Sequence, residues 1–380
     1  MKKPTMADIY SSDGVDIDLS DAFSNGAGEI CRASFSNSPF VRVNDVSDHF
    51  RGIRGLTLDG LPAGWSLDMT TDGIGTKCEI ISAASQHQWA ADDLVAMCCG
   101  DITRNGGCPV VLNNDLSINS LSNKTYPTFM RMMARLGEVA RANRLVLFRG
   151  ETAVMGDVVG SQPSSFVWSA TAVGIYLPSL MISGDRISEG QDIVALREYG
   201  FRSNGLSSVR RAFERHFGSD WKTLPEAQSW IDEAPKPSTI YDPLLTEING
   251  WYHPKFEQMV SVRGIIHVTG GAIPSKLGRD VLFPRGLSAD LEDLYSPPDV
   301  VRHCKEWRGM TSEECYTTWN CGQGVLLIID PSDTEDLLSI ARDRGYDVKP
   351  CGKVMKGDDP HIQLRSMFDG ETIRFDGCKR

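Results

Sequence analysis

The alternation of apolar and polar positions predicts strands and helices in a regular order over most of the chain. Apolar and polar side chains alternate from Trp65 to Thr70, which is typical of a half-buried strand. From about Ala90, and again from Pro127 to Ala142, apolar residues recur at helical spacing. Further apolar runs predict strands at 109–112, 145–148 and 166–176. This order indicates a first α/β domain.

A second α/β domain is predicted beyond a break between Leu177 and Gly190, where proline, glycine and serine interrupt the pattern. The elements expected after the break are a strand at 193–196, a helix from Leu206, strands at 264–268 and 325–329, and a helix at 334–344. The stretch 223–238 is polar and contains proline, so we expect a surface excursion there. Residues 1–60 are weakly periodic and read as ordered loops. The predicted domains are therefore 61–178 and 179–380, preceded by an N-terminal extension, 1–60.

The composition of the chain excludes some classes of binding partner. Of its 380 residues, 41% are hydrophobic and 23% charged, which is ordinary for a globular protein. The net charge of −11 argues against a protein that coats nucleic acid or a membrane surface, because both favour a basic footprint. Phosphorylated small molecules remain compatible with it.

The cysteines and the N-terminus suggest a cytoplasmic protein. The ten cysteines form no CxxC pair and no zinc-like spacing, so we expect reduced thiols. The N-terminus lacks the apolar stretch of a signal peptide, and no apolar run approaches the roughly 18 residues of a membrane span.

Carboxylates beside glycines are the first candidates for chemistry. Asp72-Gly73-Ile74-Gly75-Thr76-Lys77 follows the strand from Trp65, and its glycines would let an anion approach the backbone. An Asp-Gly turn of a hairpin explains the same residues. Glu151 follows the strand 145–148, where ligands of open α/β sheets lie, although a simple acidic turn is an equal alternative.

Asp101 shares a predicted helix face with Leu94, Met97 and Cys98. We therefore expect it to point inward, where a carboxylate needs a partner or a metal. The alternative is a helix that ends near Gly100 and leaves Asp101 in solvent.

Three further segments place polar residues at the ends of apolar elements. Arg202-Ser203-Asn204-Gly205 precedes a helix and could cradle phosphate, or simply cap that helix. His267-Val268-Thr269-Gly270-Gly271 ends a strand, and Asn320 opens a glycine turn. Neither a Walker loop nor a dinucleotide-binding fingerprint is present, so any ATP would bind to another architecture.

Taken together, these segments resemble the phosphoribosylformylglycinamidine cyclo-ligase family, the aminoimidazole ribonucleotide (AIR) synthetases with a PurM-like fold. The order of the matching segments is the family's, and they extend from about Tyr10 to about Leu364. They are Tyr10–Ile17, Thr71–Lys77, Asp93–Cys98, Gly150–Ala153, Ser203–Gly205, Pro237–Tyr241, His267–Gly271 and Asn320–Gly322.

The resemblance implies an enzyme with ATP and Mg²⁺ in a cleft between two layered α/β domains. It also implies a homodimer joined through the N-terminal sheets, with the N-terminal extension contributing to the ATP site. The implied reaction closes formylglycinamidine ribonucleotide (FGAM), a phosphoribosyl small molecule, to AIR. ATP phosphorylates the formyl oxygen, the amidine nitrogen attacks, and ADP and phosphate leave. No nucleic-acid or membrane partner is implied.

The resemblance also assigns roles to the candidate residues. Asp72, Asp101 and Glu151 become magnesium ligands. His267, Arg202, Asn204 and Lys77 become the catalytic candidates, with His267 as the group that transfers a proton. The predicted contacts to ATP or substrate are Asp72, Gly73, Gly75, Thr76, Ser203, Gly205, Thr269, Gly270, Gly271 and Asn320.

Departures from the family pattern leave the substrate open. Gly100 replaces an asparagine, Arg202 a histidine, and Cys31 an expected lysine, while Arg149 and Val154 alter the loop around Glu151. The Gly-Gly-Phe-Gly loop survives only as Gly52–Gly55. Arginine does not exchange a proton at neutral pH, so we expect Arg202 to act as a fixed cation on phosphate. The alternatives to an active AIR synthetase are a related enzyme that activates another amide or small substrate, and an inactive dimeric binding subunit.

Overall fold

The chain divides into two compact units. A computed structural model describes residues 17–45, 54–357 and 359–377. Met1–Cys99 and Pro109–Ile175 form unit 1, and Gly100–Cys108 and Tyr176–Arg380 form unit 2. The main division follows Ile175, just before the predicted end of the first domain at 178. The short segment 100–108, which was predicted to be part of the first domain, belongs to unit 2.

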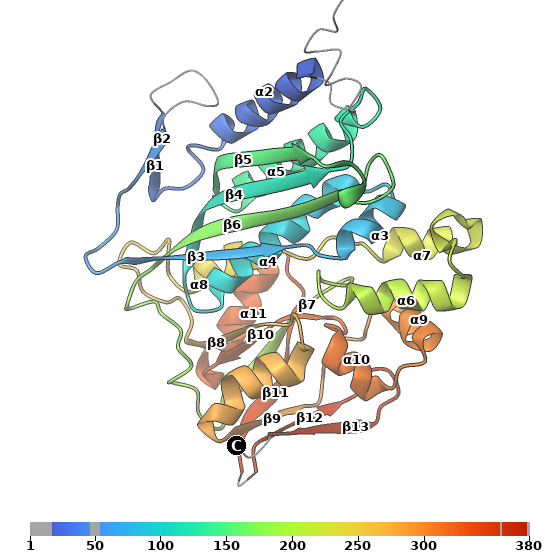
Figure 1. Cartoon of the computed structure of the whole chain (residues 1–380). Helices are drawn as coiled ribbons and strands as arrows, with labels where there is room; N and C mark the ends of the chain where they lie inside the picture. The colour runs from blue at the N-terminus through green and yellow to red at the C-terminus, as the bar shows by residue number, and fades with distance from the viewer. Residues whose placement is uncertain (1–16, 46–53, 358, 378–380) are drawn as a thin grey trace, which may run out of the picture. The chain divides into compact units, whose positions relative to one another are not determined.

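Unit 1 is built on a four-stranded sheet of order β3-β6-β4-β5 (Figure 1). Its strands are β3 (Ser66–Gly73), β4 (Cys108–Ile118), β5 (Val146–Val154) and β6 (Phe166–Tyr176). Alternate residues of β4 and β6 are buried, so one face of the sheet is covered. The other face carries the exposed apolar side chains of Leu67, Met69 and Val167.

Helices cover the buried face of this sheet. They include α3 (Lys77–Ala83), α4 (Ala90–Thr103) and α5 (Tyr126–Ala142), with the short η1 (His87–Trp89) before α4 and η2 (Gly156–Val158) after β5. The apolar positions predicted for α5 are buried, which confirms its inward face. Thr70 of β3 donates a hydrogen bond to the carbonyl of Cys98 in α4 at 2.9 Å, which identifies the helix side of β3.

The N-terminal region contains regular structure, so the prediction of loops over residues 1–60 is wrong for its described part. Helix α2 (Ile17–Ala33) packs on α5, and β1 (Val41–Asp45) pairs antiparallel with β2 (Arg54–Leu58). Phe23, Ala27 and Cys31 form the buried stripe of α2. The tertiary contacts of this stripe outweigh the low helix propensity of the surrounding serine, glycine and asparagine residues.

Unit 2 is built on a seven-stranded sheet of order β13-β12-β9-β11-β7-β10-β8. Its strands are β7 (Asp192–Arg197), β8 (Val262–His267), β9 (Leu287–Leu291), β10 (Gln323–Ile329), β11 (Val348–Lys356), β12 (His361–Arg365) and β13 (Thr372–Asp376). Neighbouring strands of this sheet are antiparallel, except that β12 runs parallel to β9. The central strand β10 is buried along its whole length, as its continuous apolar run predicts.

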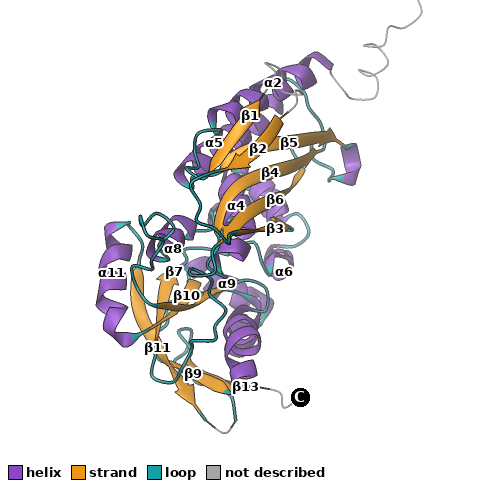
Figure 2. Ribbon diagram, turned by 90° about the vertical axis from the view of Figure 1, so that its left-hand side faces the viewer, coloured by secondary structure: helices purple, strands orange, loops and turns teal. Residues whose placement is uncertain are grey.

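Two helices of unit 2, α8 (Asp242–Ile248) and α11 (Thr334–Asp343), pack on β7, β8 and β10 and close the main core (Figure 2). The remaining helices are α6 (Leu206–Phe217), α7 (Gln228–Glu233), α9 (Asp299–Arg308) and α10 (Ser312–Thr318). Short helices are η3 (Trp221–Thr223), η4 (Pro225–Ala227), η6 (Phe283–Arg285) and η7 (Pro331–Asp333), and η5 (Pro274–Leu282) is a π-helix.

The segment 223–238 is not the surface excursion expected from its polar composition. It folds into η4 and α7, and Ala227 and Ile231 are fully buried. Among the residues that the structure describes, no helix has the length and apolar character needed to cross a lipid bilayer.

Candidate functional site

Unit 2 brings three of the predicted segments together. The loop before α6 lies against the glycine loop after β8, because a Cβ on Gly270 would be 3.4 Å from Oδ1 of Asn204. Asn320 joins the first of these loops by accepting a hydrogen bond from the backbone N–H of Arg202 at 3.4 Å. Segments more than 100 positions apart in the sequence therefore meet in one place.

Two glycines in these loops are required by the backbone. Gly205 has φ +72°, and a Cβ there would lie 2.8 Å from the carbonyl oxygen of Thr318. Gly271 has φ +79°, and a Cβ there would meet the side chain of Ser275 at 2.6 Å. Only glycine adopts such conformations without strain, so both positions are fixed by the turn geometry. The loops present backbone groups at close range, as a phosphate site needs.

A cavity of about 360 Å³ in unit 2 is lined by predicted and unpredicted residues. Asp101, His267 and Thr269 were predicted as site residues. The cations Arg104, Lys276 and Arg285 and the carboxylate of Asp280 also line the cavity. With three cations against two carboxylates, its lining is weakly positive, which suits an anionic small molecule.

Asp101 does not point into the core, which corrects the prediction from the helix face. Helix α4 continues to Thr103, beyond the end near Gly100 that the alternative assumed. The exposure that the alternative expected is found, because the side chain of Asp101 is 39% exposed, and its carboxylate lies 2.9 Å from Nη1 of Arg104. The ion pair and the exposure to solvent together stabilise the carboxylate.

His267 is buried at the end of β8, beside the last turn of α4. Its Nε2 lies 3.3 Å from Oγ1 of Thr103, and that hydroxyl also lies 2.7 Å from Oδ1 of Asp242. Burial, followed by the positive charges of Arg202 and Arg104, holds the pKa of His267 well below its usual value. The imidazole is therefore neutral at physiological pH, which is the form that can accept a proton.

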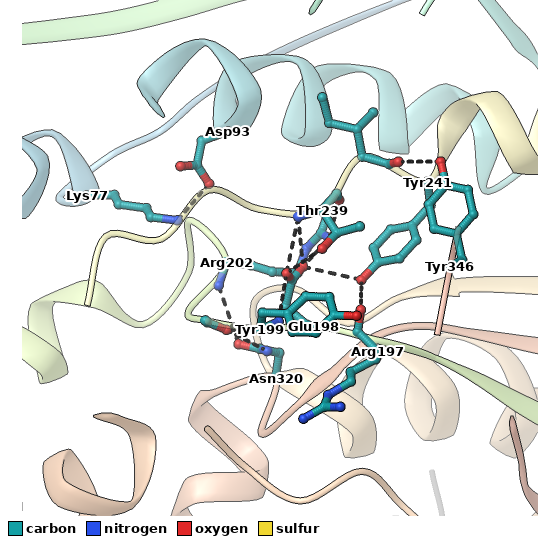
Figure 3. A network of polar contacts seen from close by, with 12 residues as sticks. Lys77, Asp93, Arg197, Glu198, Tyr199, Arg202, Thr239, Tyr241, Asn320 and Tyr346 are labelled. Atoms are coloured by element: carbon teal, nitrogen blue, oxygen red, sulfur yellow. Dashed lines mark hydrogen bonds and ion pairs between the residues drawn. The ribbon is translucent and has the colours of Figure 1, made fainter. Parts of the chain in front are cut away.

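Arg202 is engaged in a buried ion pair (Figure 3). Its Nη1 donates to Oε2 of Glu198 at 3.0 Å and to the carbonyl of Thr239 at 3.2 Å, and the guanidinium lies over the ring of Tyr241. Nε and Nη2 are buried and have no hydrogen-bond partner among the described residues. The phosphate contact assigned to Arg202 stays a prediction, and these two nitrogens are the ones that could make it.

Lys77, the catalytic candidate of unit 1, also lies in a buried ion pair. Its Nζ is 2.8 Å from Oδ1 of Asp93, and neither side chain has exposed surface (Figure 3). Desolvated pairs of this kind fix neighbouring elements in place, here α3 against α4. In this structure the ammonium group is not presented to solvent, so its role toward substrate stays a prediction.

The other predicted residues of this segment lie where β3 ends. Asp72 and Gly73 are the last residues of β3, Gly75 has φ +51°, and Thr76 precedes α3. Asp72 is exposed. The alternation along β3 places Asp72 on the same side as Thr70, which faces α4.

The structure does not bring Asp72 and Glu151 together. β3 and β5 are the opposite edge strands of the sheet. Glu151 lies within β5 rather than after it, opposite Asp115 of β4, on the uncovered face. Asp72 is on the helix side. Among the described residues no cluster of three histidine, cysteine, aspartate or glutamate side chains could hold a metal, so the magnesium assignment stays a prediction.

Comparison with known proteins identifies the first unit. Residues 57–176 match the model of the AIR synthase related protein, N-terminal domain. The chain carries an AIR synthase related domain. Over 93% of its length it is 26% identical to a phosphoribosylformylglycinamidine cyclo-ligase of Prochlorococcus marinus (strain MIT 9301), covering 97% of that protein. Another, from Burkholderia pseudomallei (strain 1710b), is 28% identical over 91% of this chain and 92% of its own. The resemblance predicted from the sequence is confirmed.

Solved structures confirm the fold. Thiamine-monophosphate kinase from Stenotrophomonas maltophilia K279a has a TM-score of 0.56 at 14% identity, over 90% of this chain and 95% of that one. Escherichia coli HypE, a hydrogenase maturation protein, gives 0.56 at 13% identity over 92% and 95%. The chain therefore has the predicted layered α/β, PurM-like fold.

The sequence analysis missed the residues around His267. Thr103 and Asp242 were not singled out, because a threonine in the last turn of a helix and an aspartate before a proline read as ordinary helix ends. Gly100 carried a signal, since glycine in a helix interior is unfavourable without a packing reason. The reason is His267: a Cβ on Gly100 would be 3.0 Å from its Nδ1.

The structure describes the N-terminal segments compared with the family only in part. Cys31 is buried in α2, and burial raises the pKa of its thiol to about 11, so it does not replace a cation. Most of Tyr10–Ile17, together with Gly52 and Ile53 of Gly52–Gly55, lies outside the described residues.

Proposed function

We propose that this protein is an ATP-dependent cyclo-ligase that closes FGAM to AIR and releases ADP and phosphate. The coverage of the relatives carries this proposal: proteins named phosphoribosylformylglycinamidine cyclo-ligase match nearly the whole chain over nearly their whole length. Because the match extends over both units, it supports the activity of the whole enzyme rather than a single shared domain.

ATP as the co-substrate is supported by a structure of the same fold. HypE in complex with ATP has a TM-score of 0.52 over 88% of this chain. ATP supplies the phosphoryl group that turns the formyl oxygen into a leaving group. In this chain, the glycine loops at Gly205 and Gly270–Gly271 fit a phosphate, because they place backbone where side chains would obstruct it.

The residues of unit 2 divide the remaining tasks. Neutral His267 accepts a proton from the attacking amidine nitrogen. Ser203, Asn204 and Thr269 supply polar groups for the ribose phosphate, and the weakly positive cavity lined by Arg104, Lys276 and Arg285 attracts an anionic substrate.

Magnesium is the metal ion of the proposal. Carboxylate oxygens are suitable ligands, and Mg²⁺ is often held by one or two of them together with nucleotide phosphates and water. Asp72 or Asp101 could supply such a single ligand, whereas Asp72 and Glu151 of one chain lie on opposite faces of their sheet.

A homodimer joined through the sheets of unit 1 is part of the proposal. The uncovered face carries Leu67, Met69 and Val167, which are 53%, 68% and 48% exposed. Large apolar side chains exposed on one face of a sheet are typical of interaction surfaces. The cytoplasmic location expected from the sequence stays a prediction.

A related enzyme that activates another amide or small substrate is the second candidate. The observation that favours it is the buried Arg202–Glu198 pair, which stands where the family has a histidine. Arginine supplies no proton, so the chemistry at this position differs from that of an ordinary AIR synthetase.

One assay separates these candidates. Purified protein is incubated with ATP, Mg²⁺ and FGAM, and the formation of AIR and ADP is followed, with a His267→Gln variant as the control. AIR formation that is lost in the variant supports the cyclo-ligase. ADP formation with other amides but not with FGAM supports the second candidate. Protein that fails to bind ATP contradicts both and leaves the binding subunit.

A further inference from the structure

The hydrogen bonds around Thr103 determine which nitrogen of His267 carries the proton. A threonine hydroxyl has one proton to donate. Oγ1 of Thr103 lies 2.7 Å from Oδ1 of Asp242, 3.4 Å from the carbonyl of Gly100 and 3.3 Å from Nε2 of His267. The carboxylate is the shortest contact and the charged one, so it takes the hydroxyl proton.

Because the hydroxyl donates to Asp242, it can only accept from His267. The imidazole then carries its proton on Nε2, and its lone pair is on Nδ1. Nδ1 is buried and has no hydrogen-bond partner among the described residues. A Cβ on residue 100 would lie 3.0 Å from Nδ1, so the glycine at this position leaves space beside the atom.

We propose that Thr103 and Asp242 are positioning residues that hold His267 as the neutral Nε2–H tautomer, so that Nδ1 is its proton-accepting atom. A buried acceptor without a partner costs free energy, and such atoms are retained where they serve a function. A carboxylate acting through a bridging hydroxyl fixes both the tautomer and the orientation of the ring.

The surrounding charges are consistent with a neutral imidazole. The charged groups that act on the pKa of His267 are Arg202 and Arg104, and both lower it. Asp242 is connected to the ring through the hydroxyl of Thr103. Burial raises the pKa of Asp242 to about 6, against the opposing effects of its bond from Thr103 and of Arg202. At pH 8 Asp242 is therefore ionised and accepts the hydroxyl proton.

The tautomer can be measured directly. The full-length protein is labelled with ¹⁵N-histidine, and long-range ¹H–¹⁵N spectra are recorded at pH 8, where bare and protonated ring nitrogens have distinct shifts. The signals of His267 are assigned by their loss in His267→Gln. We expect a protonated Nε2 and a bare Nδ1 in the wild-type protein and in Thr103→Ser, which keeps the hydroxyl. In Thr103→Val, which keeps the shape, we expect Nδ1–H to become populated.

A wild-type spectrum with the proton on Nδ1 overturns the proposal, as does a Thr103→Val variant with the wild-type tautomer. This readout needs no substrate, so it stands even if the protein makes no AIR. The consequence for catalysis rests on the proposed function. Given AIR formation, Thr103→Val should lower kcat about 10- to 100-fold with little change in KM, and Thr103→Ser should restore it. Equal kcat in all three proteins would contradict the positioning role.

Discussion

Lys77 and Asp93 form an ion pair of 2.8 Å in which neither side chain is exposed to solvent. The two residues belong to separate segments that match the cyclo-ligase family, Thr71–Lys77 and Asp93–Cys98. The pair gives these segments a shared structural role, because each charge requires the other in order to be buried.

Removing one member of this pair should make the protein less stable. We expect Asp93→Ala to lower the free energy of unfolding by about 3–5 kcal/mol, because Lys77 is left charged and buried without this partner. Urea-induced unfolding measures the loss. The double variant Lys77→Met with Asp93→Leu is the control and should be close to the wild type. A single variant as stable as the double one would show that the pair carries little of the stability.

Gly100→Ala should displace the ring of His267. The added Cβ would be 3.0 Å from Nδ1 and 3.1 Å from Cε1. Alanine in a helix interior normally gains about 0.5–1 kcal/mol over glycine, and we expect that gain to be absent here while turnover falls. Gly26→Ala in α2 is the matched control, because its Cβ meets only the flexible end of Met130. A more stable Gly100→Ala protein with full activity would rule out this packing argument.

Arg202→Met should destabilise the protein by about 3–5 kcal/mol, since Glu198 is left buried without its cation. Pairing it with Glu198→Gln should recover much of the loss in thermal unfolding. Arg202→His tests the predicted phosphate contact separately, through turnover and the affinity for ATP at a temperature where the variant is folded. If both are unchanged, Arg202 is a structural residue and not a cation on phosphate.

Asp242 should make the stability depend on pH in a defined direction. Its pKa is about 6 in the folded protein against an ordinary value of 3.8, so as the pH falls the folded state binds this proton before the unfolded state does. The contribution to stability is then full below about pH 3.8 and lost as the pH rises through about 6. Two pKa units correspond to about 3 kcal/mol.

The measurement is the difference in unfolding free energy between the wild-type protein and Asp242→Asn. As the pH is lowered from 7 to 4, the wild-type protein should gain up to about 3 kcal/mol of unfolding free energy relative to Asp242→Asn. A difference that is constant over this range would show that Asp242 titrates as an ordinary carboxyl group.

Val167→Glu should dissociate the proposed dimer. The substitution places a charge on the uncovered face of unit 1, so we expect sedimentation to change from twice the chain mass of 41.8 kDa to a single chain. Val158→Glu is the matched control, because Val158 is 80% exposed and lies in η2 outside the sheet. A Val167→Glu protein that remains dimeric would place the interface elsewhere.

Elements with strong periodicity could be predicted from the sequence, and those that depend on partners could not. The inward face of α5 follows from its own residues and is confirmed. Strand β5 was expected to stop at Phe148, because 149–154 is largely polar, yet pairing with β4 extends it to Val154. That extension places Glu151 within the sheet.

In the candidate site, too, local features could be predicted from the sequence and long-range contacts could not. Glycine-rich segments after apolar elements pointed to the loops at Gly205 and Gly271, where positive φ angles require glycine. The contact of Thr103 with Asp242 joins residues 139 positions apart, and neither local sequence contains a pattern that predicts it. The burial of a charged side chain could not be predicted either. Lys77 and Arg202 have the charges expected of substrate contacts, but each forms an ion pair inside the protein.

The assignment of Gly100–Cys108 to unit 2 has a consequence for dissecting the protein. A recombinant fragment that starts at Tyr176 would lack these nine residues, and with them the hydroxyl of Thr103 and the guanidinium of Arg104. Neither a single proteolytic cut nor a truncated gene can separate the halves cleanly, because part of the C-terminal half is encoded inside the N-terminal one.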